Sequence, residues 1–224
     1  MGNRHRAATP ASTPLQSVLQ RHGATIVKRD GWYLASDFGS VASEMAVCLS
    51  TVGITDRSDR ATLELRGAPA DVDRALSLLA DPPWRVRWLR RNSRTALVRC
   101  ERIDVSRFAA AMAPAEGTAV VDLSQRYAAV GIIGPRADEL LHTVELAKLG
   151  LEVMVLRDSQ KSYELVISAG DGPALWSHLL AAGAAFGVAC VGFDALERLS
   201  VSRGDDSAIP TEMVSDDPGA TNSP

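Results

Sequence analysis

The stretch DRSDRATLELRGAPAD (residues 56–71) returns later in the chain as DLSQRYAAVGIIGPRAD (residues 122–138). Both stretches open with the pattern Asp-x-Ser-x-Arg, continue with alternating apolar residues, and close with a Gly, an Ala and an Asp. Six positions match at an offset of 66 or 67 residues, which indicates an internal duplication. The sequence therefore predicts two copies of one structural unit.

Each copy is predicted to run strand, helix, strand, strand, helix, strand. In the first copy we expect a strand over 62–66, a helix from 69 to the prolines at 82 and 83, strands over 85–90 and 95–100, a helix over 105–112 and a strand over 119–123. In the second we expect a strand over 128–133, a helix over 135–146, strands over 152–156 and 163–167, and a helix over 173–182. Such units form an antiparallel sheet that helices cover on one face. The predicted class is α+β, with two fused ferredoxin-like (split β-α-β) units.

The repeat also sets the expected boundaries. We expect an N-terminal section over 14–55, repeat one over 56–121 and repeat two over 122–204. Within the N-terminal section we predict a helix over 14–22, a hairpin with strands over 25–28 and 32–35, and a helix over 40–50. The polar ends, 1–13 and 205–224, are predicted to be disordered tails.

Composition and charge narrow the class of protein. Lys and Arg number 24 against 27 Asp and Glu, a net charge of -3, so no basic field predicts a nucleic-acid partner. No apolar run is long enough to predict a membrane span, and no apolar segment follows the basic residues 4–6 as a secretory signal requires. Cys48, Cys100 and Cys190 are widely spaced, which is typical of buried thiols in a reducing compartment. We expect a soluble, cytoplasmic protein.

Local catalytic signatures are missing from the sequence. It contains no Gly-x-Gly-x-x-Gly, phosphate-binding loop, His-Glu-x-x-His or Gly-x-Ser-x-Gly pattern. The four histidines form no pair at i, i+4 that could bind a metal from one helix face. We therefore assign no catalytic residue and expect no metal.

Glu164 interrupts the apolar segment Tyr163–Ile167. Alternation along a strand places Glu164 and Val166 on one face of the predicted sheet and Leu165 on the other. In one interpretation Glu164 faces solvent on an open sheet. In the other it lines a cleft, where a carboxylate can accept two parallel N–H bonds from a ring such as a pterin. The pattern alone leaves both open.

A basic run with interleaved tryptophans follows the first repeat helix: Trp84, Arg85, Arg87, Trp88, Arg90, Arg91 and Arg94. Its alternation is typical of a solvated strand pair. A surface for the polyglutamate tail of a folate, or for an acidic protein, is the alternative.

Several segments together resemble the glycine cleavage system T protein (aminomethyltransferase) and the gamma subunit of heterotetrameric sarcosine oxidase. These segments are His22–Ala24, Gly31–Trp32, Glu44, Val52–Ser58, Ile133–Ala137, Tyr163–Val166, Leu175–Trp176, Leu179–Ala184 and Gly192–Leu199. Their order and spacing follow the family from about residue 14 to 204, although each motif alone is weak.

The resemblance implies a folate-binding domain and, as cofactor, tetrahydrofolate. It places Glu164 at the family's pterin-binding glutamate and adds Tyr163 and Trp32 as candidate cofactor-binding residues.

Three departures concern groups that the family uses for chemistry. Leu196 and Ser200 stand where the family carries arginines, and residues 91–95 replace an acidic hairpin without a carboxylate. The family's C-terminal barrel also has no counterpart here. Since an aspartate beside the folate can contribute about 3 kcal/mol or more to catalysis, independent turnover is not expected.

We therefore expect a degenerate folate-domain protein that serves as an accessory subunit in one-carbon or amine metabolism, similar to the sarcosine oxidase gamma subunit. Its expected partner is a large flavoprotein oxidase subunit or a second copy of itself. Two alternatives stay open: an active folate-dependent transferase in which Asp37 or Glu44 replaces the missing aspartate, and a scaffold that binds no small ligand.

Overall fold

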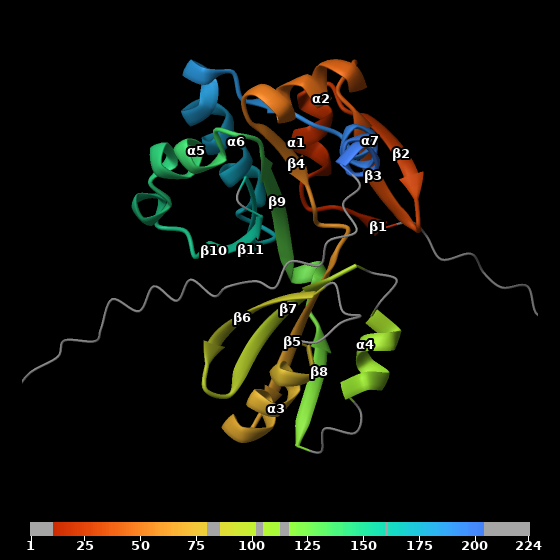
Figure 1. Ribbon diagram of the computed structural model, residues 1–224, viewed down its shortest axis with the longest axis vertical. Helices are drawn as coiled ribbons and strands as arrows, with labels where there is room; N and C mark the ends of the chain where they lie inside the picture. The colour runs from red at the N-terminus through yellow and green to blue at the C-terminus, as the bar shows by residue number, and fades with distance from the viewer. Residues whose placement is uncertain (1–10, 80–85, 102–104, 113–116, 160, 204–224) are drawn as a thin grey trace, which may run out of the picture.

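Figure 1 shows a computed structural model of the chain. The structure describes residues 11–79, 86–101, 105–112, 117–159 and 161–203. Ala11–Ser12, which the sequence assigns to the N-terminal tail, form a two-residue strand, β1. Residues 1–10 of the expected N-terminal tail and the whole expected C-terminal tail, 205–224, lie outside the described residues.

Repeat one forms the first ferredoxin-like unit. Its elements in chain order are β5 (Ala61–Gly67), α3 (Pro69–Leu79), β6 (Val86–Asn92), β7 (Thr95–Cys100), α4 (Val105–Met112) and β8 (Thr118–Asp122). The sheet order is β6-β7-β5-β8, and every pairing is antiparallel. The predicted element order is confirmed for this unit.

Repeat two forms the second unit, with one strand more than expected. Its elements are β9 (Tyr127–Ile133), α5 (Ala137–Val144), β10 (Met154–Ser159), β11 (Ser162–Ser168), α6 (Gly172–Gly183) and β12 (Ala189–Cys190). A strand of the N-terminal section, β4 (Gly53–Asp56), lies between β9 and β12, in the order β10-β11-β9-β4-β12. No strand was expected over 53–56, because the short segment Gly-Ile-Thr-Asp shows neither an apolar run nor a clear alternation.

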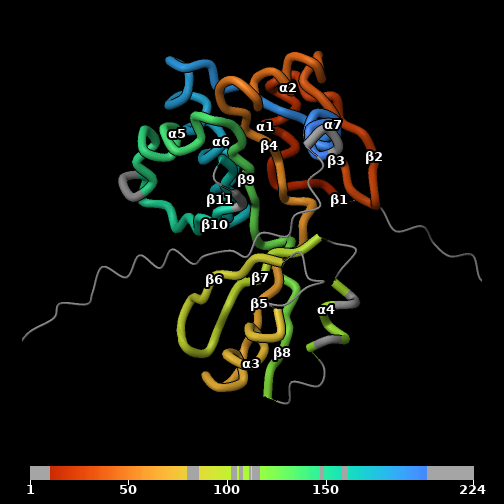
Figure 2. The backbone as a smooth tube through the Cα atoms, in the orientation of Figure 1, coloured from red at the N-terminus to blue at the C-terminus, as the bar shows by residue number. Residues whose placement is uncertain are grey.

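The rest of the N-terminal section forms a small sheet beside repeat two. Its elements are α1 (Gln16–Arg21), β2 (Thr25–Arg29), β3 (Trp32–Asp37) and α2 (Val41–Ser50), with β3 between β1 and β2. The predicted hairpin is confirmed, and Asp30 and Gly31 make its turn with positive φ angles of 48° and 81°. The last helix, α7 (Phe193–Arg203), packs against β3 and α2. In Figures 1 and 2 this section and repeat two form the upper part of the molecule, above repeat one.

Four apolar clusters of the described residues hold these layers together, and the smallest packs α2 against α7. One lies between α3, α4 and the four-stranded sheet, and a larger one surrounds α6, where Trp176 is fully buried. The third joins the two sheets to each other; its buried members are Leu97, Leu123, Ala129, Met154, Leu156 and Val166. The two units therefore share a core through the faces of their sheets that the helices leave uncovered.

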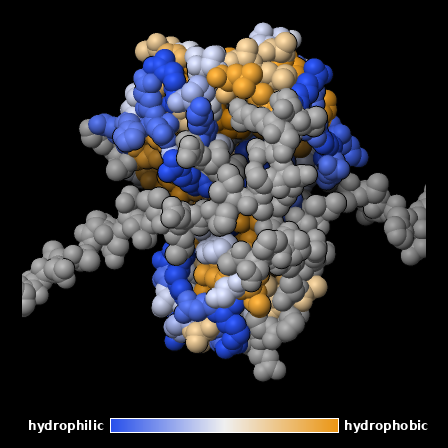
Figure 3. Space-filling model, viewed as in Figure 1, coloured by the Kyte–Doolittle hydropathy of each residue, from blue (hydrophilic) through white to orange (hydrophobic). Residues whose placement is uncertain are grey.

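Figure 3 shows further apolar side chains over α2, where Leu49 is 58 % exposed.

The duplicated Asp-x-Ser-x-Arg pattern has the same local structure in both copies. The Asp56 Oδ1 atom accepts a hydrogen bond from the backbone N–H of Ser58 at 2.9 Å. The Asp122 Oδ1 atom accepts the equivalent bond from Ser124 at 2.8 Å. Asp favours such turns because its short carboxylate reaches the backbone two residues on.

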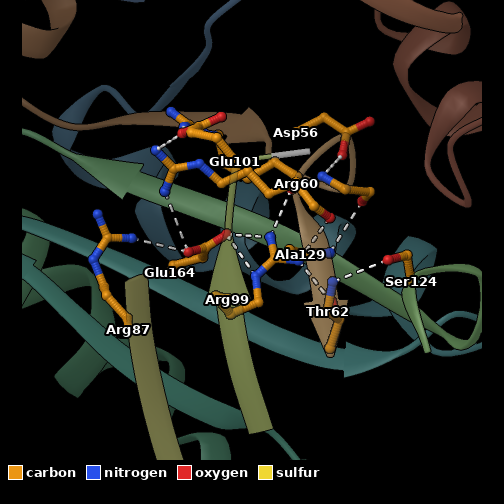
Figure 4. Close-up of polar contacts among 11 residues, drawn as sticks. Asp56, Arg60, Thr62, Arg87, Arg99, Glu101, Ser124, Ala129 and Glu164 are labelled. Atoms are coloured by element: carbon orange, nitrogen blue, oxygen red, sulfur yellow. Dashed lines mark hydrogen bonds and ion pairs between the residues drawn. The ribbon is translucent and has the colours of Figure 1, made fainter. Parts of the chain in front are cut away.

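The two serines bind the first strand of the opposite unit (Figure 4). The Ser58 Oγ atom accepts the N–H of Ala129, in β9, at 3.0 Å. The Ser124 Oγ atom accepts the N–H of Thr62, in β5, also at 3.0 Å. Each repeat thus satisfies a buried backbone donor of the other, which explains why the motif recurs.

We expect Ser58→Ala and Ser124→Ala each to lower the free energy of unfolding by about 1–2 kcal/mol, since each leaves a buried N–H unpaired. Urea denaturation measures the loss. Ser177→Ala is the matched control, because the Ser177 Oγ atom bonds to a carbonyl on an exposed helix surface. Equal losses in all three variants would contradict a special role for the two motif serines.

Candidate functional site

Glu164 lies inside the molecule, where the two sheets meet. It belongs to β11, and 2 % of its surface is exposed. Val166 packs into the cluster that joins the sheets, whereas Leu165 and Ile167 pack into the core around α6. The predicted alternation is confirmed, and the alternative that Glu164 faces solvent is wrong, because the sheet of repeat one covers this face.

Three guanidinium groups hold the Glu164 carboxylate (Figure 4). Arg99, in β7, donates from Nε to Oε1 at 3.2 Å and makes a shorter bond from Nη2 to the same oxygen. Arg87, in β6, donates from Nη1 to Oε2 at 3.2 Å. Arg60, between β4 and β5, places its Nη1 atom 3.6 Å from Oε2. Both oxygens of Glu164 are thus engaged by cations of repeat one.

Arg99 is fixed by further bonds that do not involve Glu164. Its side chain is 3 % exposed. Its Nη2 atom donates to the carbonyl of Arg57 at 2.7 Å, and its Nη1 atom to the carbonyl of Arg60 at 3.0 Å and to the Thr62 Oγ1 atom at 2.6 Å. The guanidinium therefore connects β7, the β4–β5 connection and β11 at one point.

The electrostatic balance at Glu164 favours the ionised carboxylate. Burial by itself raises the pKa of a carboxyl group, because the charge loses its hydration. Burial has that effect on Glu164, but the charges of Arg99, Arg60 and Arg87 outweigh it and hold the pKa well below its ordinary value. Glu164 is accordingly the anion of a buried ion-pair cluster that links the two units.

The basic run predicted on β6 divides into two kinds of residue. Arg90 and Arg91 have side chains 30 % and 32 % exposed and pair with the exposed acids Asp73 and Glu152, as a solvated strand would. For Arg87 that interpretation is wrong, since its side chain is 18 % exposed and binds Glu164. Trp84 and Arg85 lie outside the described residues.

Sequence reasoning did not single out Arg99, the main partner of Glu164. Arg99 stands in the apolar strand Thr95–Cys100 of repeat one, as Glu164 stands in the apolar strand Tyr163–Ile167 of repeat two. The two residues carry opposite charges and stand in corresponding strands, β7 and β11, of the two repeats. That correspondence was the feature of the sequence that could have predicted the pair.

A pocket of about 780 Å³ opens beside the cluster, between α7, the β2–β3 hairpin and the β4–β5 connection. Its apolar lining comes from Trp32, Leu34, Ala35, Phe193 and Leu196. Its charged lining comes from Arg29, Asp30, Asp56, Arg57, Asp59, Arg60, Glu101 and Glu197. The volume lies in the range of small-molecule sites.

Ion pairs occupy much of the charged lining. Arg29 binds Glu197 and stacks over the Phe193 ring at 4.6 Å. Glu101 binds Arg60 at 2.6 Å and lies 3.7 Å from Arg57. Arg60 therefore stands between the pocket, which it lines, and Glu164, which it contacts.

The structure separates the three residues predicted to bind a cofactor. Trp32 lines the pocket, and Glu164 lies behind Arg60. Tyr163 lies on the other face of β11, where its hydroxyl donates to Asp138. Leu196 and Ser200 also line the pocket, on α7. These are the two positions at which the resemblance expects arginines.

Asp37 and Glu44, the suggested substitutes for the missing aspartate, bind backbone instead. Glu44 is 5 % exposed and accepts the N–H groups of Phe38 and Gly192 at 2.7 and 2.8 Å. Asp37 accepts the N–H of Gly39 at 2.9 Å and also the hydroxyl of Ser36. These bonds, led by that from Gly39, lower the pKa of Asp37. Neither carboxylate lines the pocket.

The hairpin over 91–95 lies at the far end of β7 from the pocket. The turn is closed by the Asn92 side chain, which accepts the N–H of Arg94 at 2.8 Å, while Glu101 follows the opposite end of the strand and lines the pocket. Six strand residues separate the two ends by about 20 Å. The turn that replaces the acidic hairpin thus contributes neither a carboxylate nor a close contact to the pocket.

The residues present do not fit a pterin at Glu164. A pterin ring would need both carboxylate oxygens as acceptors, and both are engaged by Arg99, Arg87 and Arg60 in the interior. Among the described residues, no group of three or more His, Cys, Asp or Glu is placed to hold a metal ion. None of the helices in the described ranges is long and apolar enough to span a membrane.

No protein-family model matches the sequence, and no curated protein matches it at the sequence level. The structure is similar to that of the glycine cleavage system aminomethyltransferase T from Bartonella henselae, with a TM-score of 0.67, 16 % identity, and 87 % of this chain and 63 % of that chain covered. It is also similar to the heterotetrameric sarcosine oxidase from Corynebacterium sp. U-96 in complex with pyrrole 2-carboxylate, with a TM-score of 0.49, 17 % identity, and 66 % and 93 % covered. The second likeness is too weak to support a conclusion. The first shows the fold: the chain has the aminomethyltransferase fold over 63 % of that enzyme's length.

Proposed function

We propose that this chain is a non-catalytic accessory protein with the aminomethyltransferase fold, similar in role to the gamma subunit of heterotetrameric sarcosine oxidase. One observation carries the proposal: the glutamate at the family's pterin position is the buried counter-ion of Arg99, Arg87 and Arg60. A carboxylate in that state is not available to orient a folate. Tetrahydrofolate is therefore not a cofactor of this chain in the proposal.

The pocket supports the same proposal. Leu196 and Ser200 replace two cations on the α7 wall, and the guanidinium groups of Arg57 and Arg60 lie near Glu101. Transfer of a one-carbon unit needs charged groups directed at the reacting atoms. Here the charged groups are directed at one another.

The partner in the proposal is a large flavoprotein oxidase subunit, as the sequence resemblance implies. The compartment in the proposal is the cytoplasm, because none of Cys48, Cys100 and Cys190 is in a disulfide.

The isolated chain is expected to show no transfer of an aminomethyl group from lipoyl protein to tetrahydrofolate. The assay measures methylenetetrahydrofolate, with an authentic aminomethyltransferase as the positive control. Turnover that Glu164→Gln abolishes would overturn the proposal in favour of an active transferase.

If the gene for this chain lies next to genes for flavoprotein subunits, those subunits should co-elute with the chain from a size-exclusion column. Separate elution would favour a scaffold without that partner.

A further inference from the structure

We propose that the pocket beside the Glu164 cluster binds a small apolar carboxylate, and that Arg57 is the cation that pairs with the head group of this ligand. The pocket has the two parts that such a ligand needs. Its apolar wall comes from β3 and α7 and includes Leu34, Phe193 and Leu196, while Arg57 lines it from the β4–β5 connection. The ligand takes no part in one-carbon transfer, so the proposal goes beyond the accessory role and does not depend on it.

The Arg57 guanidinium is poorly satisfied by the protein itself. It donates no hydrogen bond within the described ranges, and its ion pair with Glu101 spans 3.7 Å, which is too long for a hydrogen bond. Glu101 itself binds Arg60 at 2.6 Å. The Arg57 side chain is 22 % exposed, so most of it is also shielded from water. A half-buried guanidinium whose donors are unused is a suitable partner for a carboxylate.

The charges around Arg57 leave a need for a further anion. Burial lowers the pKa of Arg57 most, and the charge of Arg60 lowers it further. The nearby acids act in the opposite direction and are outweighed; they are Asp59, Glu164 and Glu101. Since a guanidinium stays charged in proteins, a ligand carboxylate would supply counter-charge that the neighbouring acids do not.

The other acids of the lining are engaged or screened. Glu197 binds Arg29. Asp56 accepts the backbone N–H of Ser58 at 2.9 Å. The Asp30 side chain is 93 % exposed, so salt and water screen its charge. These acids therefore repel a bound anion less than their number suggests.

The second copy of the repeated motif shows that the turn itself does not require a cation. Leu123 is the counterpart of Arg57, between the motif aspartate and serine. The backbone N–H of Arg57 donates to the carbonyl of Ala129 at 2.9 Å. The N–H of Leu123 donates to the carbonyl of Thr62 at 2.8 Å, and its side chain packs between the sheets. The same backbone thus carries a buried leucine in one copy and, where the pocket opens, an arginine in the other.

Arg57 is also held in place before any ligand binds. A Cβ added to Gly131, in β9, would lie 3.1 Å from the Arg57 Cγ atom, so the stem of the side chain lies directly over that glycine. The backbone carbonyl of Arg57 accepts a hydrogen bond from Arg99 at 2.7 Å. A cation that is positioned in advance costs less ordering when the ligand binds.

The test is an NMR titration of the isotope-labelled full chain with sodium butyrate, sodium hexanoate and hexanol, at neutral pH and constant ionic strength. The indole signal of Trp32 and the amide signals of α7 report on the pocket. We expect hexanoate to bind with a Kd of about 1 mM. Butyrate should bind about 15-fold more weakly, because it buries two fewer methylenes. Hexanol, which carries no charge, should also bind more weakly than hexanoate.

Three variants separate the role of Arg57 from general effects of charge. Arg57→Leu introduces the side chain found at the corresponding position of repeat two. It should weaken hexanoate binding by about 10- to 100-fold and leave hexanol binding unchanged. Arg57→Lys keeps the charge and should retain more of the hexanoate affinity than Arg57→Leu. Arg91→Ala removes an arginine that pairs with Glu152 outside the pocket lining, so it should bind hexanoate as the native chain does.

Equal affinity of the native chain and Arg57→Leu for hexanoate would overturn the proposal. So would equal affinity of the native chain for butyrate and hexanoate, shifts confined to residues away from the pocket, or no saturable shift at up to about 20 mM hexanoate. The comparison of hexanoate with hexanol needs no variant and decides the matter if Arg57→Leu does not fold, since equal affinities would exclude a role for the carboxylate. Transferase activity of the chain, which would overturn the accessory role, leaves each of these outcomes unchanged.

Discussion

Replacement of Arg99 by alanine is expected to lower the free energy of unfolding by about 4 kcal/mol, because it removes the main counter-charge of Glu164 and leaves Oε1 without its ion pair in the interior. The variant also loses the bonds to two backbone carbonyls and to the Thr62 hydroxyl, all of them made by a side chain that is 3 % exposed. Equilibrium unfolding in urea measures the loss.

Arg91→Ala is the matched control for that experiment. Arg91 lies on the neighbouring strand, β6, and pairs with Glu152, whose side chain is 80 % exposed. Exposed pairs of this kind contribute about 0–1 kcal/mol. If Arg99→Ala costs no more than Arg91→Ala, the cluster does not hold the two units together.

A double variant tests the coupling between Arg99 and Glu164. Once Arg99 or Glu164 is gone, removal of the other also removes a buried charge that has lost its main partner. The loss in Arg99→Ala with Glu164→Ala should therefore be well below the sum of the two single losses. Additive losses would contradict direct pairing.

Replacement of Gly192 by alanine is expected to cost at least about 3 kcal/mol, or to detach α7 from β3, because overpacking against backbone cannot be relieved by a rotamer change. An added Cβ would lie 2.5 Å from the backbone nitrogen of Asp37 and would overlap the carbonyl of Ser36. The backbone N–H of Gly192 also donates to Glu44, so a shift of this residue breaks a buried bond. Since α7 carries one wall of the pocket, the pocket should change with it.

Gly170→Ala provides the comparison for Gly192→Ala. An added Cβ at Gly170 meets no heavy atom within 4 Å, and its φ is not positive. Its effect on the free energy of unfolding should stay within about 0.5 kcal/mol. Urea denaturation measures the free energy of unfolding of both variants. Similar losses would contradict the explanation that close contact with β3 requires glycine at position 192.

The fold could be predicted largely because its signals are local or repeated. The Asp-x-Ser-x-Arg pattern revealed the duplication, and the helix predicted over 105–112 has the observed bounds of α4. The alternation around Glu164 assigned the correct residues to each face of β11. Such patterns depend on neighbours in sequence, which the chain itself displays.

The parts that could not be predicted depend on distant pairings. β4 joins the sheet of repeat two although it precedes repeat one, and no feature of residues 53–56 names β9 as its neighbour. The burial of Glu164 is likewise decided by Arg99, 65 residues away. A lone charge in an apolar strand signals either solvent or a partner, and the second sheet decides which.

The most direct test of the central claim, that arginines engage the carboxylate of Glu164 and leave it unable to bind a pterin, is a calorimetric titration of the native chain with tetrahydrofolate. The account predicts no saturable heat of binding at tetrahydrofolate concentrations up to about 1 mM. A Kd of 1 mM corresponds to a binding free energy of about −4 kcal/mol, so any tighter binding would be detected. Saturable binding in the micromolar range that disappears in Glu164→Gln would contradict it, because the carboxylate would then be free to hold the ring.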